Sequence, residues 1–265
     1  MKQISSRDNP LVKQASSLKI RKYRYEEQMF LLEGERALNE LLPYRHRLVH
    51  LFIQEGMSEK YAQILSGIDE DRVVMVNASI MKVLSDTQHP QGIVAVVSMG
   101  EERELKDTNP ESGLWLLLDR ISDPGNLGTM IRTCWALDGA GILLTPGCVD
   151  PYSPKVCRSS MGGILNLPII SNVGHQEIDF LIKKGFRMFS ATAASKQIYY
   201  QTDLTGPAVL MVGSEAHGID PLLECRSSDL LQIPMKSGVN SLNAASACAI
   251  IMSEAMRQRY ASSLS

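Results

Sequence analysis

Three stretches of the chain combine glycines with polar side chains that can hold a ligand by hydrogen bonds. They are residues 123–128 (DPGNLG), residues 213–218 (GSEAHG), and residues 233–235 (IPM) with residues 241–243 (SLN). Glycines let a ligand approach the backbone closely, and backbone NH groups, amides and carboxylates can then bind it. This set suits a nucleoside-like ligand, although each stretch alone is equally consistent with an ordinary turn or helix cap.

The first two stretches each follow a continuous apolar run, residues 114–118 (LWLLL) and residues 208–212 (AVLMV). Such runs are typical of buried parallel strands, and ligands of open α/β sheets bind at the carboxyl ends of those strands. We therefore expect an α/β layer with its chemistry at one edge of the sheet. Strands are expected at residues 114–118, 141–145, 186–191 and 208–212, and helices at residues 127–137, 155–160, 176–184 and 243–260.

The first hundred residues also alternate between strand-like and helix-like patterns, which predicts a second α/β layer. Strands are expected at residues 49–54, 73–76 and 93–97, and helices at residues 9–24, 36–42, 58–65 and 78–84. Residues 100–113 hold five acids, two bases and no apolar residue except Leu105. That composition is typical of a linker. The predicted division is a domain at residues 1–99, a linker at residues 100–113 and a domain at residues 114–265.

Composition excludes several classes of protein. A hydrophobic fraction of 44% and a charged fraction of 21% are close to globular averages. No run approaches the roughly 18 apolar residues that cross a bilayer, and the N-terminus lacks the apolar region of a secretory signal. The five cysteines are scattered, with no CxxC pair, so we expect reduced thiols, no metal and a cytoplasmic location. The absence of GxGxxG and Walker A sequences argues against nicotinamide and ATP.

The charge is unevenly distributed. The chain carries a net charge of -2, but seven bases stand against one acid in the first 24 residues. A concentrated basic patch is typical of a surface that binds nucleic acid, although solvated helix faces also collect lysine and arginine. The expected basic helix at residues 9–24 is therefore a candidate RNA contact.

The polar stretches, taken in order, resemble the three motifs of the SpoU branch of the SPOUT RNA methyltransferases, also called the TrmH family. The matching sequences are DPGNLGTMIRT, VGSEAHGI, and IPM followed by SLNAASA. In the first hundred residues SSRDNPLVK, FLLEGERAL and HPQGIVAVV resemble the ribosomal-protein-like substrate-binding domain of many members. The resemblance implies a C-terminal SPOUT domain with a deep trefoil knot around a parallel sheet, a smaller α/β substrate-binding domain before it, and a homodimer.

The resemblance also implies roles for individual residues. It places Asn126, Arg132, Glu215 and Asn243 at the reacting centre. S-adenosylmethionine would be held, largely by backbone groups, at Thr192, Ala193, Gly213, Glu215, Gly218, Ile233, Met235, Ser241 and Leu242. The basic residues expected to contact RNA are Lys13, Lys19, Arg21, Lys22, Arg24, Arg36 and Arg158.

The expected activity is S-adenosylmethionine-dependent methylation of a ribose 2'-hydroxyl, with large-subunit ribosomal RNA favoured as substrate. Arg132 is either the base or a clamp on the neighbouring phosphate, because a guanidinium stays charged in proteins. His217 also lies in the second motif, but no partner for it is visible in the sequence, so we do not assign it as the base. The alternatives are a transfer RNA 2'-O-methyltransferase and a non-catalytic RNA-binding module that retains the knot.

Overall fold

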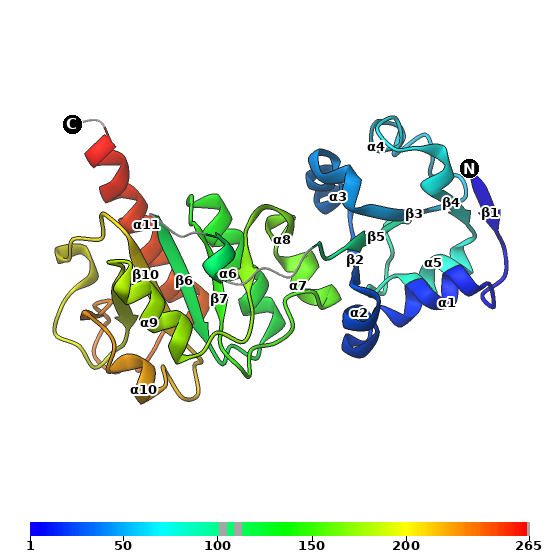
Figure 1. Ribbon diagram of the computed structural model, residues 1–265. Coiled ribbons are helices and arrows are strands. Elements are labelled where there is room, and N and C mark those ends of the chain that lie inside the picture. Colours follow the sequence, from blue (N-terminus) through cyan, green and yellow to red (C-terminus); the bar gives the residue numbers. More distant parts are fainter. Residues whose placement is uncertain (101–104, 109–112, 264–265) are drawn as a thin grey trace. The chain divides into compact units, whose positions relative to one another are not determined.

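The computed structural model describes residues 1–100, 105–108 and 113–263 (Figure 1). The chain forms two compact units. The first contains Met1–Glu102 and Asp150–Leu165, and the second contains Arg103–Val149 and Asn166–Ser265. Residues 101–104 and 109–112 of the predicted linker lie outside the described residues.

The first unit is built on a five-stranded mixed sheet of order β1-β4-β3-β5-β2. Its strands are β1 (Lys2–Ile4), β2 (Met29–Glu33), β3 (Leu48–Gln54), β4 (Val73–Val76) and β5 (Ile93–Ser98). Strand β4 pairs in parallel with β1 and β3, whereas β5 is antiparallel to β3 and β2. The helices of this part of the chain are α1 (Pro10–Ser17), α2 (Arg21–Glu27), α3 (Glu35–Leu41), α4 (Ala62–Leu65) and α5 (Ala78–Leu84), with 3-10 helices at Leu42–Arg47 and Glu70–Arg72.

The single helix predicted over residues 9–24 is wrong, because two helices occupy this range. Asn9 caps α1 as expected, accepting the Leu11 amide at 3.0 Å. The first helix ends at Ser17, and the carbonyl of Leu18 then accepts the Arg24 guanidinium at 2.7 Å. A side chain from the second helix thus satisfies a carbonyl released at the break. The predicted helix at residues 58–65 is likewise reduced to the four residues of α4.

The second unit is built on a six-stranded sheet of order β11-β9-β10-β6-β7-β8, and each adjacent pair is parallel. The strands are β6 (Leu114–Asp119), β7 (Gly141–Leu144), β8 (Ile169–Ile170), β9 (Arg187–Ala191), β10 (Ala208–Gly213) and β11 (Asp229–Leu231). Every residue of the two central strands, β6 and β10, is buried, which confirms the interpretation of their apolar runs.

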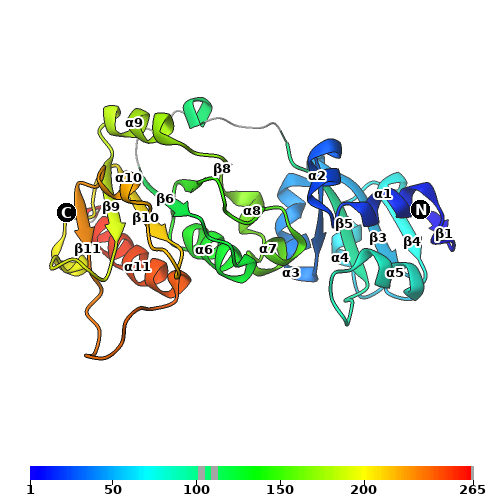
Figure 2. The same cartoon turned by 90° about the horizontal axis from the view of Figure 1, so that it is seen from below.

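Helices cover both faces of this parallel sheet. They are α6 (Pro124–Ala136), α9 (His175–Lys183), α10 (Pro221–Glu224) and α11 (Ala244–Ser263), with 3-10 helices at Leu105–Thr108 and Tyr199–Gln201. Figure 2 shows α9 on one face, where Ile178 and Leu181 pack against Trp115 and Leu117 of β6. Helices α6 and α11 pack together on the other face. Leu105, assigned to the predicted linker, is part of the core on the α9 side.

The segment Asp150–Leu165 belongs to the first unit, although the predicted boundaries placed it in the C-terminal domain. It carries α7 (Pro154–Ser159) and the start of α8 (Gly163–Asn166). Asp150 is 6% exposed and forms an ion pair with the Arg24 guanidinium, and the Tyr152 ring lies 5.1 Å from that of Phe30. These partners are far away in sequence, which explains why a composition-based boundary misses them. The knot stays a prediction.

Candidate active site

The first polar stretch lies at the carboxyl end of β6 and opens α6. Asp123 accepts the backbone NH of Asn126 at 2.7 Å, and Pro124 occupies the first helical turn. This cap starts the helix at Pro124, three residues before the predicted start at residue 127. Asn126 therefore lies in the first turn of α6 rather than in a loop.

Three of the four residues predicted at the reacting centre form one hydrogen-bonded cluster. The Asn126 amide donates to Glu215 Oε1 at 2.6 Å. The Asn243 amide donates to Asn126 Oδ1 at 2.9 Å and to Glu215 Oε1 at 3.3 Å. The backbone NH of Ala244 also donates to Glu215 Oε1, at 3.2 Å. The starts of α6 and α11 and the loop after β10 thus meet at one carboxylate oxygen.

Arg132, the fourth predicted residue, is not part of this cluster. Its side chain is exposed on α6 and has no hydrogen-bond or ion-pair partner among the residues that the structure describes. Six residues along a helix correspond to a rotation of about 120° away from Asn126. A charged, unpaired guanidinium is available to a ligand or partner that approaches the helix from that side.

The loop after β10 folds back on itself. Gly218, with a φ of +64°, donates its backbone NH to the Ser214 carbonyl at 2.8 Å. A Cβ atom on Gly213 would lie 2.1 Å from the carbonyl carbon of Gly218, so only glycine fits. The fold of this loop leaves Glu215 and His217 exposed at its tip.

The buried carboxylate of Asp119 holds the C-terminal end of this loop at Asp220. The sequence had suggested no role for it. Asp119, the last residue of β6, is 2% exposed. Its Oδ2 accepts the Asp220 backbone NH at 2.8 Å, and its Oδ1 accepts the Thr145 hydroxyl at 2.8 Å. Arg120 completes the set with an ion pair to Asp119 at 3.0 Å. An aspartate that closes a buried apolar strand was the signal in the sequence that could have identified this anchor.

The predicted cofactor residues lie around the same edge of the sheet in two groups. Thr192 and Ala193 follow β9 and are tied to the end of β11, where the Thr192 NH donates to the Leu231 carbonyl at 2.9 Å. The Gln232 amide donates to the Ala193 carbonyl at 3.2 Å. The second group, residues 213–218 with residues 241–242, is joined by the bonds of Glu215 to Asn243 and Ala244.

Backbone groups close to both groups remain unused. Across residues 1–100, 105–108 and 113–263, no protein group forms a hydrogen bond with the backbone of Ile233, Met235 or Leu242. All three residues are half-buried. A ligand could therefore bind to their NH and carbonyl groups without displacing an existing bond.

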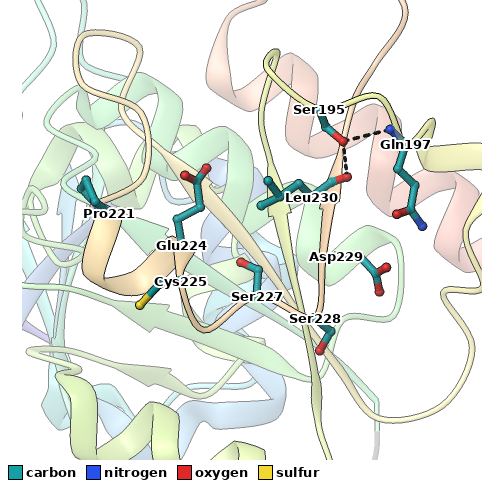
Figure 3. A pocket seen from close by; sticks show the side chains of 9 residues that line it. All are labelled: Ser195, Gln197, Pro221, Glu224, Cys225, Ser227, Ser228, Asp229 and Leu230. Carbon is teal, nitrogen blue, oxygen red and sulfur yellow. Dashed lines mark hydrogen bonds between the residues drawn. The ribbon is translucent and has the colours of Figure 1, made fainter.

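A separate cavity of about 570 Å³ lies along the edge strand β11 of the same unit (Figure 3). Its lining includes Glu224, Cys225 and Asp229, and no predicted site residue. Ser195 Oγ donates to the Leu230 carbonyl at 2.6 Å and accepts the Gln197 NH at 2.9 Å. This cavity gives no support to the predicted cofactor position.

The predicted RNA contacts on the basic N-terminal helices need one clear correction. Arg24 is 2% exposed and donates to Asp150 at 2.9 Å, so it cannot contact RNA. Lys19 is also occupied, because it donates to the carbonyls of Val83 and Ser85, and burial lowers the pKa of its amine. Both residues were assigned from charge alone, which does not distinguish a buried cation from an exposed one.

The other predicted RNA contacts are accessible. Lys13 and Lys22 form surface ion pairs with Asp8 at 2.8 Å and Glu26 at 3.7 Å. The Arg21 guanidinium lies 5.4 Å from the centre of the Tyr25 ring. Arg36 is exposed without a partner among the described residues, and Arg158 pairs with Asp86 at 3.2 Å.

The described residues hold neither a metal-binding cluster nor a membrane-spanning helix. No group of three or more histidine, cysteine, aspartate or glutamate side chains in this part of the chain is arranged to hold a metal ion. No helix in it is long and apolar enough to cross a membrane. Three cysteines are buried, and burial raises the pKa of the Cys134 thiol to about 12.

Known protein families match both halves of the chain. The profile of the SpoU rRNA methylase family matches residues 113–253, and that of the MRM3-like substrate binding domain matches residues 9–95. A tRNA/rRNA methyltransferase of Synechocystis, described as uncharacterized, is 34% identical over 267 residues, covering 98% of this chain and 95% of the relative.

Two further relatives have more specific descriptions. The 23S rRNA (guanosine(2553)-2'-O)-methyltransferase of Bacillus subtilis is 29% identical over 252 residues, covering 95% of this chain and 98% of the relative. The crystal structure of an AdoMet-bound rRNA methyltransferase from Sinorhizobium meliloti has a TM-score of 0.86 at 29% identity and covers 97% of each chain. Because the family profile spans more than half of the sequence and these relatives span nearly all of it, the chain belongs to the SpoU rRNA methylase family.

Proposed function

We propose that this protein transfers a methyl group from S-adenosylmethionine to a ribose 2'-hydroxyl of large-subunit ribosomal RNA. The observation that carries the proposal is the cluster of Asn126, Glu215 and Asn243, in which three segments distant in sequence meet at one carboxylate. The Bacillus relative, whose name specifies 2'-O-methylation of 23S rRNA, supports the substrate class. Because this relative is a bacterial enzyme, we place the action of the present protein in the cytoplasm.

The residues around the cluster fit S-adenosylmethionine. The unused backbone groups of Ile233, Met235 and Leu242 can bind its polar atoms, and the folded-back loop at Gly213 allows close approach. The crystal structure of the Sinorhizobium relative, described as AdoMet-bound, supports this assignment. When bound, the cofactor supplies an electrophilic methyl group on a positively charged sulfur.

Methylation requires the ribose oxygen to be in line with the methyl group and to lose its proton. Glu215 Oε1 is occupied by the three donors of the cluster, whereas Oε2 has no partner among the described residues. We assign Oε2 to orient the ribose hydroxyl or the Arg132 guanidinium. Arg132 then clamps the adjacent phosphate, and a phosphate oxygen or water accepts the proton, because the guanidinium itself remains charged.

Arg132 also supports a homodimer in this proposal. Arg132 is exposed on α6 and lies outside the cluster of its own chain. This position suits an active site that is completed beside a subunit interface. Sedimentation of the purified protein tests this part of the proposal, and a monomer under assay conditions that retains full activity would refute it.

The activity is tested by incubating the protein with methyl-labelled S-adenosylmethionine and total RNA from a strain that lacks the gene. We expect label in large-subunit ribosomal RNA at one 2'-O position, and a strongly reduced signal with Asn126→Ala. Label confined to transfer RNA would overturn the substrate class. Calorimetry separates the remaining alternative, because a non-catalytic RNA-binding module would bind RNA but neither bind the cofactor nor label any RNA.

A further inference from the structure

A second cavity lies entirely within the first unit, where β2 ends and α3 begins. Its volume is about 460 Å³, and residues of three stretches line it: residues 33–39, residues 87–91, and Arg158 with Met161. Ligand pockets commonly measure roughly 300–1,000 Å³, so this one has room for a compact group such as a single nucleobase. No residue of the Asn126 cluster lines it.

Hydrogen bonds between the loops hold the walls of this cavity in place. Glu33 accepts the Ser85 hydroxyl, the Thr87 hydroxyl at 2.9 Å and the Asp86 backbone NH at 3.1 Å. On the opposite loop, Gln91 Oε1 accepts the Glu35 backbone NH at 3.0 Å. The cavity is therefore preformed, and a ligand would not have to order these loops on binding.

The third wall is held by a close approach of the Gly162 backbone to the side chain of Glu40 on α3. Gly162 has a φ of +99°, and a Cβ atom on it would lie 2.5 Å from the Cγ of Glu40 on α3. Glycine thus lets the segment carrying Arg158 and Met161 pack directly against α3. This wall comes from the part of the chain that matches the methylase family, whereas the other walls come from the part that matches the substrate-binding domain.

Several polar groups of the lining are not used by the protein. Arg36 and Asn39 are spaced three residues apart on α3, which places them on the same face of the helix. Neither side chain has a partner among the described residues, and the Gln91 Nε2 atom is also unpaired there. A guanidinium and two amides are the groups that proteins use to read the hydrogen-bonding edges of nucleobases.

The charge balance of the lining favours a nucleobase over a phosphate as the ligand of this cavity. The two cations, Arg36 and Arg158, are matched by the carboxylates of Glu33 and Glu35, and Arg158 is additionally paired with Asp86. Phosphate sites need an excess of positive charge, which this lining lacks. A neutral base has no such requirement, and the His89 ring offers it a stacking surface.

We propose that this cavity receives one unstacked base of the substrate RNA and reads its edge through Asn39, Gln91 and Arg36. The inference rests on the proposed function, because it takes RNA as the substrate, but it assigns a recognition site that is separate from the methyl-transfer cluster. Sequence-specific RNA recognition commonly works in this way, by binding bases that have left the helical stack.

The test measures binding of unmodified 23S ribosomal RNA, made by transcription, to the full chain in the absence of cofactor. Asn39→Ala should raise the dissociation constant about tenfold, as expected for loss of a base-edge contact. The dependence of binding on salt should not change, because no phosphate contact is lost. Lys82→Ala is the matched control, since Lys82 is exposed on α5 of the same unit and does not line the cavity.

Arg36→Lys provides a second variant that distinguishes shape from charge. Lysine keeps the positive charge but lacks the planar fork, so Arg36→Lys should bind RNA as weakly as Arg36→Ala. If Asn39→Ala binds RNA as tightly as the wild type, the cavity makes no contact with a base and the proposal is overturned. If Arg36→Lys binds like the wild type while Arg36→Ala lowers the salt slope by about one, Arg36 contacts a phosphate instead, and the proposal is also overturned. Failure of the methylation assay would not affect this measurement, because binding is measured without the cofactor.

Discussion

Removing the Asp119 carboxylate should destabilise the second unit and release the loop that carries Glu215. In Asp119→Ala the Asp220 backbone NH loses an acceptor at 2.8 Å, and the Thr145 hydroxyl loses another at 2.8 Å. An orphaned buried donor costs about 1–3 kcal/mol. The Thr145 hydroxyl retains a weak alternative in the Pro146 carbonyl at 3.5 Å, so its share lies at the low end.

Together, the two lost hydrogen bonds should lower the free energy of unfolding by about 3 kcal/mol. The Arg120 side chain of the ion pair is 37% exposed, so its loss adds under about 1 kcal/mol. For a unit of this size we expect the melting temperature to fall by roughly 6–12 °C. Asp119→Asn should cost only about 1 kcal/mol, because its oxygen can still accept the Asp220 NH while its NH2 group donates to the Thr145 oxygen.

Differential scanning calorimetry measures this effect, since it can resolve separate transitions of the two units. The control is Glu224→Ala, which removes a carboxylate of the same unit that has no hydrogen bond or ion pair to another described residue and should change stability by less than about 0.5 kcal/mol. Titration calorimetry should also show weaker cofactor binding in Asp119→Ala than in Asp119→Asn. If Asp119→Ala melts at the temperature of Glu224→Ala, the anchoring role is refuted.

Three further predictions concern the loop, the reaction and the fold of the first unit. Gly213→Ala places a methyl group 2.1 Å from the Gly218 backbone and should abolish cofactor binding in calorimetry, whereas Gly174→Ala, with a nearest contact of 3.5 Å, should bind normally. Arg132→Lys keeps the charge but loses the bidentate fork, so kcat should fall at least about tenfold with the KM for cofactor unchanged; activity near wild type would refute the phosphate clamp. Asp150→Ala leaves the Arg24 guanidinium buried without its carboxylate and should cost about 3–5 kcal/mol, and an unchanged denaturation midpoint would contradict that.

The long buried elements were predictable from the sequence because burial on both faces produces continuous apolar runs. Strands β6 and β10 follow this rule, and so does the helix after β6, whose Met130, Ile131 and Cys134 are all buried. Four strands were missed. Strand β2 has five residues, and β1, β8 and β11 have only two or three residues each. No periodicity can develop over so short a length, and their pairing is decided by the neighbouring strand.

Long-range partners explain the errors in the first unit. Nothing near Arg24 in the sequence indicates that its guanidinium is buried, because its partner Asp150 lies 126 residues away. The Arg24 guanidinium also donates to the Leu18 carbonyl at the break between α1 and α2, and its partner Asp150 begins the segment 150–165 that belongs to this unit. Charge patterning locates basic residues, but only the tertiary fold decides which of them remain available to RNA.

Asn243 shows why the candidate site was harder to predict than the strands that support it. Its motif suggested two interpretations, a helix cap and a residue of the reacting centre, and the amide allows both. Its Oδ1 accepts the backbone NH groups of Ala245 and Ser246 at 3.0 and 3.2 Å, which caps α11. These two bonds use the amide oxygen of Asn243. The NH2 group of the same amide therefore faces the cluster and donates to Asn126 and Glu215. The start of the last helix therefore orients the cluster, and aspartate, an equally good cap, could not replace asparagine because it would offer an acceptor to Glu215.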